Sequence, residues 1–315
     1  MTAVPLAALP IEPAGAAGPI EGRGPLRLAW ARLRRDRVAI ASAVTIAVLV
    51  AVAAGAPLIA HLVGHDPYTQ YRETGLTPDG LPVGPSRHFL LGTDNLGRDL
   101  LVRIVYGARI SLLVGVVSTM LAVAAGVVVG LTAGYFRGAV DTFLARFLDV
   151  VLSFPFLLFA IALVSIVGPS LTVSIFVIAF FSFAAVGRIV RGQTLSIRER
   201  EYIQAARSLG ASDARIMFVD VLPNLLAPVI VYATLLVPVA IVFEATLSFL
   251  GLGVVPPTPD WGGMLSDSLQ FYQVAWWYVL FPGLALLTTT LAFNLLGDSV
   301  RDALDPGTER VLAAT

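Results

Sequence analysis

Six long apolar segments alternate with polar stretches along the 315-residue chain. They cover roughly residues 38–60, 110–134, 147–168, 171–190, 225–250 and 277–297. Each is about 20 residues long or longer, which is the length that an α-helix needs to cross the hydrocarbon core of a bilayer. The pattern therefore predicts an all-α, polytopic membrane protein with six transmembrane helices.

The regions that flank these spans differ from them in composition. Residues 1–37 start with an aperiodic stretch rich in Ala, Pro and Gly and end in an arginine cluster, so we expect a flexible, basic N-terminal tail. Residues 38–306 form the six-span domain, and residues 307–315 form a C-terminal tail. The first apolar segment has the basic flank of a signal peptide. Its length of about 23 residues exceeds the 7–15 of a secretory core, which favours a membrane anchor.

The arginine distribution predicts the orientation, because short cytoplasmic loops are enriched in basic residues. A cytoplasmic N-terminus also places the 135–146 loop, the 191–224 loop and the C-terminus in the cytoplasm, and these regions hold most of the arginines. The 251–276 connection, which then lies outside, has none. The outer loop 61–109 carries five arginines, which five acidic residues offset, and it is long enough to fold.

Three residue types that often carry chemistry are absent or rare. The sequence contains no cysteine, which excludes disulfides and thiolate metal sites. All 21 basic residues are arginine, so a GxxxxGK[ST] phosphate-binding loop cannot form. The three histidines all lie between the first two apolar segments, outside the spans. We therefore expect no enzyme activity, no catalytic residue, no metal site and no cofactor on this chain.

Two polar or small-residue features lie inside the predicted spans. Gly126, Gly130 and Gly134 form two overlapping GxxxG steps, which let two helices approach closely. They serve either packing within the subunit or contact with a partner subunit. Glu244 lies within the fifth apolar segment, where a carboxylate is costly. It is a candidate for the translocation path, and a water-accessible position near the outer interface is the alternative.

Three prolines also interrupt apolar segments, at positions 155, 228 and 238. Proline removes a backbone donor and tends to kink a helix. We expect the third and fifth spans to be bent at these positions.

The predicted cytoplasmic loop 191–224 has a helical pattern of its own. One small apolar face recurs at helical spacing, formed by Tyr202, Ala205, Ala206 and Leu209. Gly210 follows, at a position where helix ends favour glycine. Ser212 or Asp213 is expected to cap a second helix, which Pro223 ends.

This pair of helices is too short to bury a core. It either lies flat on the membrane interface or docks its ridge of small residues into a groove on a cytoplasmic partner. Alanine at positions 205 and 206 favours docking, since small side chains let a backbone approach closely. Nucleic acid is not an expected partner, because the loop is tethered between two spans and has no clustered base-reading face.

Several motifs resemble a known family. Gln204-Ala205-Ala206, Gly210 and Leu222-Pro223 are similar to the EAA loop of binding-protein-dependent ABC permeases, EAA-x3-G-x9-I-x-LP. Gln204 and Asp220 depart from that pattern, which has Glu and Ile there. Three further motifs are similar to the dipeptide, oligopeptide and nickel branch of DppC/OppC type: residues 92–99 with 107–112, 244–262, and 294–306.

The resemblance implies a type I ABC importer permease. With a second permease of DppB/OppB type, it would form a path for di- or oligopeptides across the cytoplasmic membrane. Two ATPase subunits would bind ATP and Mg²⁺, and an extracytoplasmic binding protein would deliver the substrate. The implied ATPase-coupling residues are Tyr202, Gln204, Ala205, Ala206, Gly210, Leu222 and Pro223. Nickel or another small solute is an alternative cargo. An ion-coupled secondary transporter would need a membrane ion site, for which Glu244 is the candidate.

Overall fold

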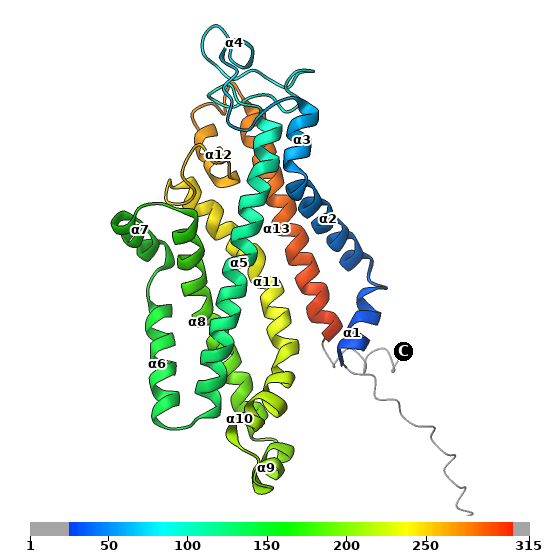
Figure 1. Cartoon of the computed structure of the whole chain (residues 1–315), viewed down its shortest axis with the longest axis vertical. Helices are drawn as coiled ribbons and strands as arrows, with labels where there is room; N and C mark the ends of the chain where they lie inside the picture. The colour runs from blue at the N-terminus through cyan, green and yellow to red at the C-terminus, as the bar shows by residue number, and fades with distance from the viewer. Residues whose placement is uncertain (1–24, 305–315) are drawn as a thin grey trace, which may run out of the picture.

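A computed structural model describes residues 25–304, and the regular structure in that range is helical apart from two isolated β-bridges. The all-α prediction is confirmed. Residues 1–24 and the predicted C-terminal tail lie outside the described residues. The helices form an elongated bundle (Figure 1). Helix α9 (Glu201–Ser208) lies at one end, and α4 (Arg72–Gly75) and α12 (Trp261–Ser268) lie toward the other. We call these the α9 end and the α12 end.

Five of the described helices are long and apolar enough to cross a membrane. They are α2 (Arg37–Ala54), α5 (Leu100–Tyr135), α8 (Leu171–Arg198), the continuous stretch Asp213–Phe249 that contains α11 (Leu222–Phe249), and α13 (Trp276–Leu304). The third predicted span is a pair of helices, α6 (Ala139–Ser153) and α7 (Phe156–Val167), which meet at an angle of 84°. The described chain therefore has five spans, or six if this bent pair counts as one.

The bend lies where Pro155 interrupts the third apolar segment. Phe154 has an extended backbone, with φ −79° and ψ 132°. A residue before proline favours that region, because the proline ring clashes with a helical neighbour. Pro228 and Pro238, in contrast, lie inside α11 without ending it.

The structure corrects two predicted boundaries. Residues 25–33, which we expected to belong to a flexible tail, form helix α1 (Pro25–Leu33). This helix packs on α13 because it has an apolar side, where Ala29 is buried. The loop predicted at 61–109 is shorter, since α3 (Ala56–Val63) extends into it and α5 starts at Leu100. The apolar pattern does not predict the start of α5 because arginines interrupt it, although one of them, Arg103, is buried in the structure.

Helix α5 is the central element, and its longest contact is with α8. The three glycines of the GxxxG steps lie in this contact. A Cβ atom at Gly126 would lie 2.5 Å from the Cβ of Val186, and one at Gly130 would lie 2.5 Å from the carbonyl oxygen of Gly187. At Gly134 it would lie 2.6 Å from the Cβ of Thr194. The glycines therefore pack two helices of the same subunit together.

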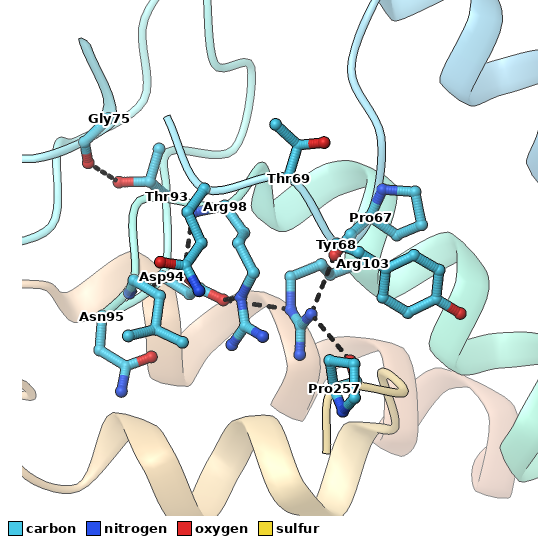
Figure 2. A network of polar contacts seen from close by, with 12 residues as sticks. Pro67, Tyr68, Thr69, Gly75, Thr93, Asp94, Asn95, Arg98, Arg103 and Pro257 are labelled. Atoms are coloured by element: carbon cyan, nitrogen blue, oxygen red, sulfur yellow. Dashed lines mark hydrogen bonds and ion pairs between the residues drawn. The ribbon is translucent and has the colours of Figure 1, made fainter. Parts of the chain in front are cut away.

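The connection between α3 and α5 is folded onto the α12 end of the bundle. Asp94 accepts hydrogen bonds from the backbone N–H and the Nε of Arg98, at 2.9 and 2.6 Å. The indole N–H of Trp277 donates to the carbonyl oxygen of Thr93 at 3.3 Å, and Tyr278 donates to the side chain of Asn95. This polar network, drawn in part in Figure 2, fixes the connection to the start of α13.

Candidate functional site

At the α9 end the chain leaves α8, forms the short helix α9 and turns back into the bundle. The turn is at Gly210, whose φ of +81° lies in the left-handed region that favours glycine. The Ser212 hydroxyl accepts a hydrogen bond from the backbone N–H of Arg215 and so caps the next helix. Because α8 continues to Arg198 and this helix begins at Asp213, the loop comprises residues 199–212, and the predicted range 191–224 was too wide.

The prediction that Pro223 ends the second helix is wrong. Helix α10 (Asp213–Arg215), a π-helical turn η1 (Ile216–Val221) and α11 follow one another without a break. The backbone N–H of Leu222 donates to Met217, five residues earlier. Pro223 then lies in the first turn of α11, where a missing N–H and a fixed φ are tolerated. The loop is therefore joined directly to a membrane span.

The loop exposes an apolar surface. Ile203 is the residue of α9 that is buried, whereas Tyr202 and Leu209 are 42% and 88% exposed. Phe218 and Val219, on the adjoining π-helical turn, are 60% and 57% exposed. Apolar side chains gathered at the end of a bundle indicate a surface that a partner covers. The other coupling candidates range from exposed to half-buried: Gln204, Ala205, Ala206, Leu222 and Pro223.

Two side chains that sequence reasoning missed, Tyr135 and Arg198, hold the residues on either side of this loop against the end of α5. The Tyr135 hydroxyl donates to the Asp213 carboxylate at 2.6 Å. The guanidinium of Arg198, which is buried, donates to the carbonyl oxygens of Gly134 and Tyr135 at 3.1 and 2.7 Å. Helix ends leave such carbonyls without an intrahelical partner. These contacts join residues more than 60 positions apart, so no local pattern indicates them.

Glu244 lies inside the subunit, with 0% of its surface exposed. Its carboxyl group accepts hydrogen bonds from Ser111 on α5, at 2.8 Å, and from Ser248 one turn further along α11, at 3.0 Å. The structure thus places Glu244 at a contact between two spans, with none of its own surface exposed. Satisfied hydrogen bonds explain how a carboxyl group is accommodated at that depth.

A groove lies between α8, α11 and α13, toward the α9 end. This groove has a volume of about 840 Å³. Apolar side chains and proline form part of its wall, and polar groups interrupt them: Gln193, Arg200, Asn224, Tyr232 and Arg301. Such a mixed lining suits a polar solute better than a lipid tail.

The polytopic helical bundle with its projecting helical loop suits a membrane transport protein, and comparison with known proteins specifies which kind. Residues 126–310, more than half of the chain, match the family described as binding-protein-dependent transport system inner membrane component. Residues 24–78 match the N-terminal TM domain of oligopeptide transport permease C. The chain belongs to this family of inner-membrane permeases, and it is a permease subunit of an ABC importer.

Three curated relatives each align with 90% of this chain. The dipeptide transport system permease protein DppC of Escherichia coli K12 is 46% identical over 282 residues, 93% of its own length. DppC of Alkalihalophilus pseudofirmus is 44% identical over 282 residues, 90% of its length. The glutathione transport system permease protein GsiD of Pectobacterium atrosepticum is 41% identical over 284 residues, 92% of its length.

Solved structures agree on the fold. Two inward-facing structures of the MetNI methionine ABC transporter superpose with TM-scores of 0.55 and 0.56 at 18% identity. The matches cover 64% and 65% of this chain, and 96% and 98% of the solved chains. The predicted type I ABC importer fold is therefore confirmed, and the family match confirms the assignment to transport permeases.

Proposed function

We propose that this subunit forms, with a second permease, the path by which an ABC importer moves di- and oligopeptides across the cytoplasmic membrane. The observation that carries the proposal is the exposed α9 loop, which presents Tyr202 and Leu209 outward and continues into a span. The peptide cargo is supported by the relatives, which are named for dipeptides and for glutathione.

The α9 loop has two routes by which a push from an ATPase reaches the membrane. One is the continuous helix from Asp213 to Phe249, which would tilt as a unit. The other is the set of bonds from Arg198 and Asp213 to the end of α5. ATP and Mg²⁺, bound by two partner ATPase subunits, would bias the pair of permeases between two states through these contacts.

The groove between α8, α11 and α13 is the surface that we assign to the translocation path, in place of Glu244. It lies toward the α9 end, and its polar residues offer hydrogen bonds to a peptide backbone. In this arrangement the α9 end of the bundle and helix α1 face the cytoplasm. The α12 end faces the extracytoplasmic binding protein.

The proposal is tested by purifying the chain with its partners and reconstituting the complex in vesicles with the binding protein. We expect ATP-dependent accumulation of labelled dipeptides and tripeptides, and none without ATP. Labelled nickel and free amino acids serve as the comparison cargo. ATP-dependent uptake of nickel with no uptake of any peptide in the panel would contradict the proposed cargo. Uptake driven by an ion gradient without an ATPase would contradict the transporter class.

A further inference from the structure

A cavity at the α12 end is lined by charged side chains of both signs. Its volume is about 170 Å³, enough for a small polar group but not for a whole oligopeptide. Arg98 and Arg103 line it from the start of α5 and the connection before it, and Asp260 and Asp267 line it from α12 and its cap. The cavity lies far from the α9 loop and is used by none of the contacts described there.

The two arginines are held in place by one carboxylate. Asp94 lies 2.6 Å from the Nε of Arg98 and 3.1 Å from the Nε of Arg103. Arg103 also donates to the carbonyl oxygens of Pro67 and Pro257, at 3.0 and 3.4 Å (Figure 2). Both arginines are 4% exposed. They therefore present fixed positive groups, and little side-chain entropy remains to be lost when a ligand binds.

The two carboxylates of α12 have no such partner. Among residues 25–304, neither Asp260 nor Asp267 lies within ion-pair distance of an arginine. Asp260 is 4% exposed and caps α12 by accepting from the backbone N–H of Gly263 at 2.7 Å. Asp267 remains accessible at the surface, seven residues along. Burial raises the pKa of both carboxyl groups, and the charge of Arg103 acts in the opposite direction on each.

The charges on the wall indicate the kind of ligand. Two arginines, Arg98 and Arg103, and two aspartates, Asp260 and Asp267, line the cavity, so its wall carries equal numbers of positive and negative groups. A bare metal ion does not suit it, because the arginines repel a cation and the described residues contain no group of three metal-ligating side chains. A ligand that carries an ammonium group beside a hydrogen-bond acceptor matches both walls.

We propose that the cavity binds the amino-terminal residue of a peptide, with its ammonium group between Asp260 and Asp267 and its first carbonyl oxygen toward Arg98. The inference rests on the proposed peptide cargo and adds a subsite to it. At the α12 end, this subsite lies where a peptide released by a binding protein would first meet the permease.

The test uses the complete complex in lipid nanodiscs without the binding protein, and measures equilibrium binding of labelled Ala-Ala. We expect Asp267→Asn and Asp260→Asn each to weaken binding about tenfold or more, since hydrogen bonds to charged groups are worth that much. Asparagine is as good a helix cap as aspartate, so Asp260→Asn keeps α12 intact. Asp79→Asn, an exposed position in the α3–α5 connection, is the matched control and should bind as the wild type does.

Competing peptides test whether the cavity recognises the ammonium group. Ala-Ala amide keeps the ammonium group and should compete as Ala-Ala does, whereas N-acetyl-Ala-Ala lacks it and should compete at least tenfold less well. Equal competition by N-acetyl-Ala-Ala, or wild-type binding by both asparagine variants, overturns the subsite. Displacement by Na⁺ or Ni²⁺ at the concentration of the peptide overturns it as well. ATP-driven uptake in the same complex reports on the proposed function separately, because uptake can persist when the subsite is disproved.

Discussion

Replacing Gly210 with valine isolates the conformation of the coupling turn. The φ of this residue is +81°, and no atom lies within 4 Å of a Cβ placed there. The penalty is therefore conformational and not a clash. A β-branched residue in the left-handed region costs about 1–2 kcal/mol, which lowers the population of the native turn by roughly five- to thirtyfold. Asparagine tolerates this region, so Gly210→Asn is the matched control.

The measurement is the number of peptides transported per ATP hydrolysed by the reconstituted complex. We expect Gly210→Val to insert into the membrane and assemble normally, because the turn lies outside the spans. The number of peptides that it transports per ATP should fall by up to the factor by which the native turn is depopulated, while ATP hydrolysis continues. The same ratio for Gly210→Asn should stay near that of the wild type. A wild-type ratio for Gly210→Val would refute the coupling role of the turn. Equal loss in both variants would show that side-chain bulk matters and backbone conformation does not.

Three further predictions concern packing and polar contacts. Gly130→Ala should destabilise the subunit by about 1–3 kcal/mol, because the new Cβ atom would meet the backbone of α8. Gly192→Ala is the control, because a Cβ atom there meets open space, and thermal unfolding of the complex distinguishes the two variants. Tyr135→Phe, which removes the hydroxyl bond to the α9 loop, should lower the transport ratio without loss of assembly, and an unchanged ratio would contradict this anchor. Asp94→Asn should leave the two buried arginines unpaired, and residues 64–99 should then exchange their amide hydrogens faster. Asp79→Asn should not have this effect, and equal exchange in both variants would disprove the role of Asp94.

The existence of the spans could be predicted from the sequence because hydrophobicity over about 20 residues is a local property. Their boundaries could not, wherever a polar residue is satisfied by a distant partner. Arg103 interrupts the apolar pattern and so hides the first ten residues of α5, yet it is buried against Asp94. The bend at Pro155 was predictable, since proline acts on its immediate neighbour.

In the coupling loop, too, local features could be predicted from the sequence and contacts between distant segments could not. The turn at Gly210 and the cap at Ser212 follow from backbone conformation and from one local hydrogen bond, so the sequence indicates both. The role of Pro223 was misjudged because the preceding π-helical turn changes which donors the helix needs. The link from Tyr135 to Asp213 spans 78 residues and depends on how α5 and the loop meet in space.

The way in which the fold pairs buried charges explains why the sequence indicated Glu244 as a candidate and did not indicate the cavity at the α12 end. A carboxylate within an apolar segment is conspicuous, but Ser111 and Ser248 satisfy Glu244, and a satisfied group has little capacity left for a ligand. Asp260 and Asp267 are inconspicuous, because they lie in a polar connection. Among the described residues, neither lies within ion-pair distance of an arginine, since Asp94 already holds the two nearby arginines. The capacity to bind thus follows from which charges the fold leaves unpaired, and this depends on contacts between segments more than 150 residues apart.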